Sequence, residues 1–359
     1  MNKLMRRREF ISGLALLGFG AALAGCAPQS PKTSEPTTSP TTAPTAEPTK
    51  PAVLATPAPT ATRQPPAPAT ATTAPTATSR PAATAAASGS EAAYLAVVRG
   101  ASPEAITMRA IAAIGGIERF VKKGYDVIIK PNICNANNGP EYASTTNPEV
   151  VATLVKLCLG AGAKRVRVMD YPFAGTAQAA YARSGIEAAV KAAGGEMEVM
   201  AAMRFVETPI PAGVDLKSWM IYEPVLKADL VINVPIAKHH GLARLTLAGK
   251  NLMGVIQDRG SIHRNLGQRI ADLTSVIRPQ LTVVDAVRML MANGPTGGNL
   301  ADVKQANTVI ASADLVAADA YATTLFGLKP EEISYVAASA KMGLGTMDLQ
   351  SIKIVELSI

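Results

Sequence analysis

The sequence predicts an α/β protein with a mostly parallel sheet and helices on both of its faces. Between residues 91 and 359, short apolar runs alternate with longer segments of helical periodicity. Such alternation is typical of parallel strands joined by crossover helices. Residues 26–90 are almost wholly Pro, Thr, Ala and Ser, so the residues that follow them have to build the fold.

Seven apolar runs are expected to form strands and four segments to form helices. The predicted strands are Tyr94–Val98, Asp126–Ile129, Arg165–Met169, Leu230–Val234, Leu281–Val284, Thr308–Ala311 and Ile352–Leu357. The predicted helices are Pro103–Val121, Val150–Gly160, Thr176–Ala193 and Asp314–Phe326. We expect one α/β domain over residues 91–359, or alternatively two closely packed lobes, 91–235 and 236–359.

Residues 1–25 are expected to form a cleaved signal peptide. Basic residues at positions 6–8 precede Phe10, and an apolar stretch follows at 14–23. The order Arg-Arg-x-Phe resembles the twin-arginine export motif, and the stretch is too short for a transmembrane helix. Leu-Ala-Gly-Cys at 23–26 resembles a lipobox, which implies that Cys26 is acylated. The sequence therefore predicts an extracytoplasmic lipoprotein, exported by the twin-arginine route and anchored in a membrane.

The segment at 26–90 is expected to be a disordered spacer. Apart from Val53 and Leu54 it has no apolar periodicity, so it cannot bury a core. A Pro-rich chain of this kind is extended and semi-rigid. It would hold the folded domain away from the lipid surface.

The positive charge of the chain is spread over its segments. The chain has 35 Lys and Arg against 27 Asp and Glu. Residues 1–25 and 27–90 each carry four basic residues, with one and two acidic residues respectively, which leaves 27 basic against 24 acidic residues in 91–359. An excess of three charges in a domain of this size does not indicate a nucleic-acid partner.

Three cysteines limit the metal chemistry of the chain. Cys26 is expected to carry lipid, which leaves Cys134 and Cys158 in the folded domain. Two thiolates cannot by themselves hold a four-cysteine cluster or a structural zinc ion, so we expect no iron–sulfur cluster on this chain alone. The two are expected to be buried thiols, or alternatively a disulfide permitted by an oxidising location.

The segment Asn233–Arg269 is the part of the sequence richest in chemistry. It contains all three histidines of the chain, His239, His240 and His263. Its basic residues are Lys238, Arg244, Lys250, Arg259, Arg264 and Arg269, against the single acid Asp258. A local surplus of five positive charges indicates an anionic ligand. We predict that Lys238, Arg244, Asn251 and Arg259 contact this ligand.

Other strand ends add to the same predicted site. Lys130 and Asn132 directly follow a strand, and the polar loop after them enters a helix N-terminus suited to anions. The alternative is a capped turn with a solvated lysine. The loop with Gly294 and Gly297 is expected to supply backbone donors. Since ligands bind beyond the carboxyl ends of parallel strands, we expect these residues and the histidine segment around one cavity. Alternatively, Lys250 and His263 lie on opposite faces of a helical stretch.

Familiar catalytic motifs do not account for the segment. The glycines near Lys250 are too widely spaced for a phosphate-binding loop, and Asn251 stands where such a loop needs Ser or Thr. Gly-x-Gly at 343–345 comes too late to open a dinucleotide-binding unit. Neither Gly-x-Ser-x-Gly nor His-Glu-x-x-His occurs in the sequence, so the commonest hydrolase signatures are absent.

A series of landmarks resembles a prokaryotic family without an established activity, the family of domain of unknown function 362. In chain order the landmarks are Ile128–Asn132, Thr145–Pro148, Gly160–Lys164, Asn233–Pro235, Lys238–His239, Gly249–Gly254, Asp285, Gly294–Gly297, Ala318–Ala320 and Gly327–Leu328. They span almost all of the predicted domain. Many members of that family carry an added ferredoxin-like iron–sulfur domain, which we do not expect in this chain.

A second resemblance, to the N-terminal domain of nickel-pincer lactate racemases, concerns His240, Lys250 and His263. In those enzymes a histidine precedes a cofactor-bearing lysine and a nickel-binding histidine. The resemblance implies that Lys250 tethers or salt-bridges a metal-containing cofactor, that His263 ligates the metal and that His240 is the acid and base. His239 is a second candidate metal ligand. Those enzymes use another histidine after an earlier strand, where this chain has Asp170.

Two classes of function remain open. The first is a membrane-tethered protein whose cavity binds an anionic ligand or a metal-containing cofactor for an isomerase-like or redox reaction. The alternative is a non-catalytic lipoprotein that captures a small anion. The expected partners are a lipid membrane, through Cys26, and the anion, with a redox or membrane protein as a further partner.

Overall fold

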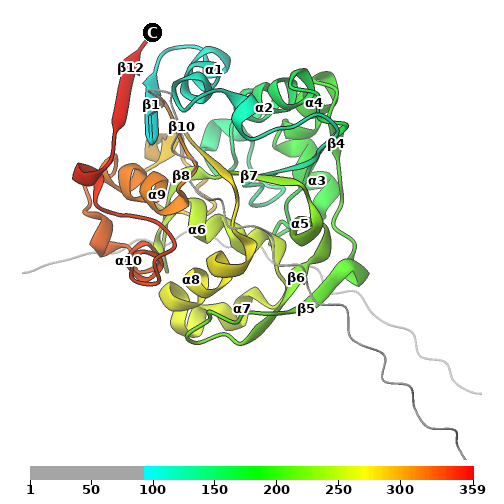
Figure 1. The fold of residues 1–359 in the computed structure, drawn as a ribbon, viewed down its shortest axis with the longest axis vertical. Helices are drawn as coiled ribbons and strands as arrows, with labels where there is room; N and C mark the ends of the chain where they lie inside the picture. Colours follow the sequence, from blue (N-terminus) through cyan, green and yellow to red (C-terminus); the bar gives the residue numbers. More distant parts are fainter. Residues whose placement is uncertain (1–92) are drawn as a thin grey trace, which may run out of the picture. The chain divides into compact units, whose positions relative to one another are not determined.

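The computed structural model describes residues 93–359. The signal peptide, the spacer and the lipidated Cys26 predicted for the first 90 residues lie outside this part. The described residues form a ten-stranded mixed sheet with helices on both faces and a separate two-stranded sheet (Figure 1). The predicted α/β class is confirmed.

The large sheet is mostly parallel. The strands of both sheets are β1 (Leu95–Arg99), β2 (Asp126–Pro131), β3 (Arg165–Val168), β4 (Glu196–Met197), β5 (Phe205–Pro209), β6 (Ser218–Tyr222), β7 (Leu230–Val234), β8 (Ile236–His240), β9 (Arg244–Thr246), β10 (Leu281–Leu290), β11 (Val303–Ser312) and β12 (Ile354–Ser358). The order of the large sheet is β12-β1-β11-β10-β7-β2-β3-β4, with β8 paired to β10 and β9 to β8. Within the large sheet, only the pairs that include β11 or β9 are antiparallel.

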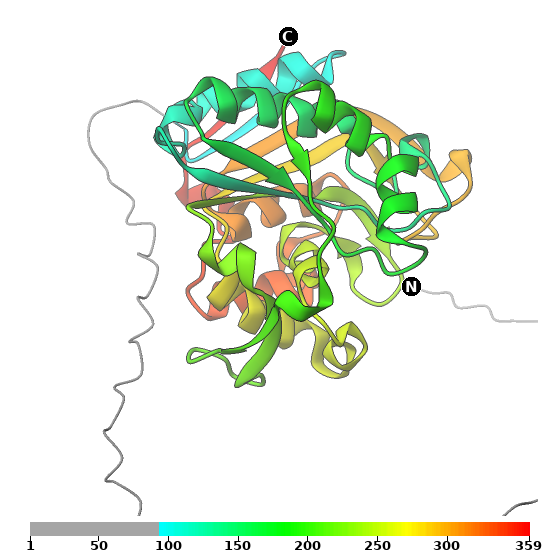
Figure 2. The same cartoon turned by 90° about the vertical axis from the view of Figure 1, so that its right-hand side faces the viewer.

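Helices cover both faces of this sheet, α1, α2 and α4 on one and α6, α8 and α9 on the other (Figure 2). The helices are α1 (Pro103–Ala113), α2 (Pro148–Gly160), α3 (Ala177–Arg183), α4 (Ile186–Ala192), α5 (Glu223–Lys227), α6 (Ala248–Asn251), α7 (Arg259–Ile262), α8 (Leu266–Ile277), α9 (Leu315–Thr324) and α10 (Ser334–Lys341). Along β2, Val127 and Ile129 belong to one core and Ile128 to the other. Burial on both faces explains the continuous apolar runs.

Glycines shorten two of the predicted helices. The helix predicted at 103–121 ends at Ala113, and Gly116 beyond it has a φ of 81°. The helix predicted at 176–193 is divided into α3 and α4 by Gly185, whose φ is 73°. Positive φ values are incompatible with a right-handed helix and are adopted most easily by glycine.

The longer helices α8 and α10 were not predicted, and neither were several short elements before β10. These are the β5–β6 pair, the β8–β9 hairpin and the four-residue helices α6 and α7. Elements of three to five residues are too short to display a helical or strand period. They matter here because the β8–β9 hairpin, α6 and α7 form much of the site.

The carboxyl ends of β2, β3 and β7 meet at one edge of the sheet, because these strands are parallel neighbours. Lys130 near the end of β2, Asp170 just after β3 and the hairpin after β7 therefore come together. Residue 235 is the boundary between the two lobes of the alternative prediction, and strands from before and after it belong to this one sheet. Within residues 93–359, no helix is long and apolar enough to span a membrane.

Candidate functional site

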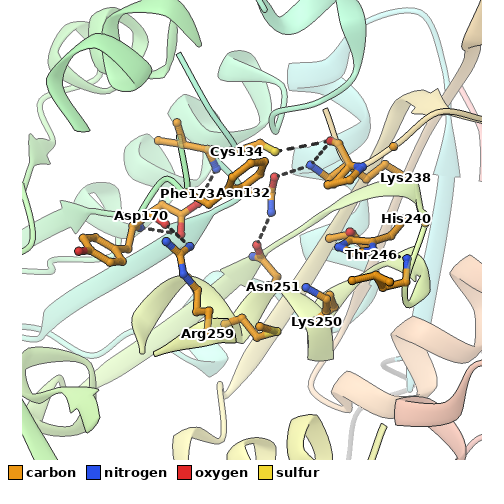
Figure 3. Close-up of a pocket in the computed structure, with 18 of the residues that line it drawn as sticks. Asn132, Cys134, Asp170, Phe173, Lys238, His240, Thr246, Lys250, Asn251 and Arg259 are labelled. Atoms are coloured by element: carbon orange, nitrogen blue, oxygen red, sulfur yellow. Dashed lines mark hydrogen bonds between the residues drawn. The ribbon is translucent and has the colours of Figure 1, made fainter. Parts of the chain in front are cut away.

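A cavity of about 390 Å³ lies at this carboxyl edge (Figure 3). The volume is within the range of roughly 300–1,000 Å³ typical of small-molecule sites. Lys130, His240, Lys250 and His263, which come from four separate parts of the chain, all line it. So do five further residues of the predicted site, Asn132, Lys238, Asn251, Arg259 and Gly294.

Lys130 forms a buried ion pair with Asp170. Its Nζ donates to Asp170 Oδ1 at 2.7 Å, to Asn251 Oδ1 at 2.9 Å and to the carbonyl oxygen of Pro131 at 2.8 Å. These bonds use all three hydrogens of the ammonium group. Burial lowers the pKa of Lys130, and the charge of Asp170 opposes that shift. The solvated lysine of the alternative interpretation is not observed, and Lys130 has no donor left for a ligand.

Lys238 is a second buried lysine whose donors are all used. From β8, its Nζ donates to Asn132 Oδ1 at 3.0 Å and to the carbonyl oxygens of Ser144 and Pro295 at 2.7 and 2.9 Å. None of these partners is negatively charged. The positive charge of Lys238 is therefore solvated by neutral oxygens and contributes to the electrostatic potential of the cavity.

Arg259, in α7, holds one rim of the cavity in place. Its guanidinium donates to the carbonyl oxygens of Tyr171 at 2.6 Å and Pro172 at 3.1 Å, and it lies 4.9 Å from the centre of the Tyr171 ring. Burial lowers the pKa of Arg259, and Asp170 opposes this shift. Since a guanidinium stays charged at any ordinary pH, Arg259 is a further fixed cation.

Lys250 differs from these cations because no described residue hydrogen-bonds to its Nζ. It lies in the short helix α6, whose first backbone N–H groups, those of Ala248 and Gly249, donate to the buried carboxylate of Asp319 at 2.6 and 2.8 Å. Burial, with help from neighbouring cations, lowers the pKa of Lys250 to about 8. The amine is therefore held in position and left available.

His240 presents an N–H group to the cavity. Its Nδ1 accepts hydrogen bonds from the backbone N–H groups of Leu242 at 3.1 Å and Ala243 at 3.3 Å. The neutral ring must then carry its hydrogen on Nε2. Burial, followed by the positive charges of Lys250 and Lys238, lowers the pKa of His240 to about 3. At physiological pH the ring is a neutral hydrogen-bond donor.

Thr246 completes this side of the cavity. Its Oγ1 is buried and has no hydrogen-bond partner among residues 93–359. In Figure 3, Thr246, His240 and Lys250 lie together on one side, and Asp170 and Phe173 lie on the other. We call His240, Thr246 and Lys250 the donor wall, because each has a polar group that no described residue satisfies.

The charges that line the cavity are unbalanced. Four cations line it, Lys130, Lys238, Lys250 and Arg259, whereas Asp170 is the only acid among the described lining residues. The surplus of three charges favours an anion inside. Of the three lysines, only Lys250 has donors left to bind one directly.

Three residues of the predicted site are not among the lining residues. His239 points to the opposite side from its neighbours in β8, as alternate residues of a strand do, and its Nδ1 accepts from Gly294 N at 3.1 Å. Arg244 pairs with Glu332 at 3.1 Å on the surface. Gly297 lies in the loop after β10, away from the lining.

His263 is exposed at the edge of the cavity. Its Nδ1 lies 3.3 Å from the carbonyl oxygen of Gly260. A carbonyl oxygen only accepts, so the hydrogen bond requires the hydrogen on Nδ1 and leaves Nε2 free. In His239, by contrast, Nδ1 accepts a hydrogen bond, so the neutral ring of His239 carries its hydrogen on Nε2. His263 thus has the free ring nitrogen that a metal needs, but no group of three or more His, Cys, Asp or Glu within residues 93–359 could hold a metal ion alone.

Sequence reasoning missed several lining residues, among them Cys134, Phe173, Thr246 and the ion-paired Asp170. Asp170 follows a predicted strand, as Lys130 does, and this position at a strand end could have identified it as a site residue. Thr246 and Phe173 have residue types too common to carry a signal. Cys134 and Cys158 are buried free thiols and form no disulfide.

A family model described as "Domain of unknown function (DUF362)" matches residues 127–324. A thylakoid-associated protein of Synechocystis sp. is 28% identical over 246 residues, which cover 64% of this chain and 72% of that protein. The lactate racemase apoprotein from Thermoanaerobacterium thermosaccharolyticum superposes with a TM-score of 0.40 at 12% identity, over 67% of this chain and 57% of the racemase.

Proposed function

We propose that this chain, which belongs to the family of domain of unknown function DUF362, binds a small organic anion in the cavity at the edge of its sheet. The donor wall is the observation that carries the proposal. A buried polar group without a partner costs about 1–3 kcal/mol. A carboxylate, with two oxygens and about four lone-pair sites, can accept from His240 Nε2, Thr246 Oγ1 and Lys250 Nζ together.

Lys250→Met is expected to weaken carboxylate binding about ten- to hundredfold, because a hydrogen bond to a charged group contributes roughly 1.5–3 kcal/mol. Isothermal titration of the full chain with acetate, lactate and octanoate measures the effect. The matched control is Lys191→Met, at a surface lysine paired with Glu187, which should leave affinity unchanged. The proposal fails if none of the three acids binds the unaltered protein, or if Lys250→Met binds them equally well.

An isomerase-like reaction is a second candidate, favoured by the amine of Lys250. A pKa of about 8 lets this group release and take up a proton near physiological pH. The predicted role of His240 as a base has no support, because two backbone N–H groups occupy its Nδ1. We infer that Lys250 would move the proton while His240 hydrogen-bonds the substrate oxygen. Incubation of each acid with the protein in D₂O, followed by measurement of the mass of the acid, tests this. Absence of deuterium uptake beside the carboxylate excludes proton exchange with that acid.

A metal-containing cofactor, as implied by the racemase resemblance, would be held by Lys250 and His263. The former has a free amine and the latter a free Nε2, but the described residues offer no metal-binding group beside them. This donor set suits a cofactor that brings most of its own metal ligands. When bound, it would supply an electrophilic centre beside the donor wall.

We infer that the chain is exported and tethered to a membrane through Cys26. The support is the residue pattern at 6–26 and the thylakoid association in the name of the Synechocystis relative. Neither the signal nor the anchor lies in the described part of the chain.

Replacing Arg7 and Arg8 by Lys is expected to block export, since the twin-arginine pair is what the motif requires. Cys26→Ala should leave the protein without lipid. Cell fractionation and intact mass measure both outcomes, and the intact mass of the native protein also reveals any adduct on Lys250. Normal export of the double-Lys variant would contradict the twin-arginine assignment.

A further inference from the structure

Two apolar side chains stand exposed at the mouth of the cavity. Phe173, in the turn after β3, is 53% exposed, and Leu242, in the β8–β9 turn, is 72% exposed. Both belong to the lining. Single exposed apolar side chains are common on protein surfaces. The positions of Phe173 and Leu242 and the anchoring of their backbone therefore decide whether they contribute to ligand binding.

The backbone at Phe173 is fixed, although its side chain is exposed. Phe173 N donates to the carbonyl oxygen of Cys134 at 3.1 Å, and Ala174 forms a parallel bridge with Asn135. The two preceding carbonyl oxygens accept from Arg259. The ring is thus presented to solvent by an anchored segment.

Leu242 is anchored in a similar way on the other side. Its backbone N–H donates to Nδ1 of His240, the bond that also sets the tautomer of that ring. The turn that presents Leu242 is therefore fixed to the donor wall. Phe173 lies opposite that wall in Figure 3. The two exposed side chains come from the two sides of the mouth.

The lining of the cavity includes further apolar surface from Ile133, Met253 and Pro295. The ionic and polar groups on the side of Asp170 are already bonded to one another. A ligand whose carboxylate lies on the donor wall therefore meets apolar atoms on its way out of the cavity. A very small acid would leave this surface in contact with water.

We propose that the preferred ligand is a monocarboxylate with an apolar body, such as a medium-chain or aryl acid, whose body is covered by Phe173 and Leu242. The proposal rests on the anion-binding function proposed above. Burial of each methylene contributes about 0.8 kcal/mol, or about fourfold in affinity. Affinity should then rise steeply with chain length, which a site for a small hydroxy acid would not show.

The test is a calorimetric series of acetate, butanoate, hexanoate and octanoate on the full chain, with octanol as the uncharged probe. We expect about a fourfold gain per added methylene until the body passes the mouth. Phe173→Ala and Leu242→Ala should each reduce that gain. Met203→Ala is the matched control, because Met203 is 90% exposed and outside the lining, and it should leave the gain unchanged.

The outcomes separate this proposal from the anion-binding function. If acetate and octanoate bind equally and both depend on Lys250, the apolar-body proposal is overturned and the anion site stands. If octanol binds as well as octanoate, or no acid depends on Lys250, the anion-binding function fails. If Met203→Ala reduces the gain in affinity per methylene as much as Phe173→Ala does, the acids adsorb non-specifically and the proposal is overturned.

Discussion

The Asp170→Ala variant is expected to lose about 3–5 kcal/mol of unfolding free energy, the usual cost of removing one partner of a buried ion pair. Its melting temperature should fall by on the order of 10 °C. In the variant, the buried ammonium of Lys130 loses its only carboxylate, the backbone N–H group of Ile133 loses its acceptor, and that of Tyr171 keeps only the carbonyl oxygen of Gly254. Chemical denaturation with both variant and unaltered chain measures the loss.

Two comparisons make this prediction specific. Glu187→Ala removes an exposed ion pair with Lys191 and should cost no more than about 0.5 kcal/mol. The double variant Lys130→Met with Asp170→Ala should be more stable than Asp170→Ala alone, because it leaves no uncompensated buried charge. Equal losses for Asp170→Ala and Glu187→Ala would show that the pair does not hold this edge of the sheet.

The ion pair also explains a glycine that the sequence could only register as a landmark. A methyl group on Gly254 would overlap Asp170 Oδ1 and Lys130 Nζ. Tyr171 N also donates to the carbonyl oxygen of Gly254 at 3.1 Å. The glycine is thus required by close approach of three strand-end segments, a constraint that appears only once the strands are placed side by side.

Most of the sheet was predictable from its apolar runs, whereas the twelve-residue helix α8 was not predicted. The seven predicted strands match β1, β2, β3, β7, β10, β11 and β12, since each contains an apolar run. In β2, β7 and β10 this run is buried on both faces of the sheet. The antiparallel insertion of β11 between β1 and β10 was not predictable, because an apolar run has the same appearance in either direction. Both β10 and β11 are longer than predicted. The first continues past residue 284 to Leu290, and the second begins at Val303 and not at Thr308.

The site was predictable in position but not in the roles of its side chains. Parallel strand ends indicated that Lys130 and the histidine segment would meet, and both line the cavity. The sequence predicted that Lys130 and Lys238 contact an anion and that Lys250 tethers a cofactor. The hydrogen bonds distinguish the three lysines. Every N–H donor of Lys130 and Lys238 is hydrogen-bonded to an oxygen of the protein, whereas no described residue accepts from Lys250. Saturation of donors depends on tertiary contacts and has no signature in sequence.

Carboxylate binding is expected to fall as the pH rises above 8, by up to tenfold per pH unit. Burial lowers the pKa of Lys250 to about 8, so the group is an ammonium below that pH and a neutral amine above it. A bound anion favours the ammonium and raises its pKa, so the fall ends where the pKa of the complex is reached. Between pH 8 and 10 the loss should therefore approach a hundredfold.

The choice of pH keeps the titrations of His240 and Asp319 out of this range. His240, with a pKa of about 3, is neutral throughout. Burial raises the pKa of Asp319, which holds helix α6, to about 7, so a series that starts at pH 8 begins with this carboxylate already ionised. Lys250→Arg is the matched variant, because a guanidinium remains charged up to pH 10 and beyond. Its octanoate affinity should be level from pH 8 to 10, and a parallel fall in that variant would place the titration on another group.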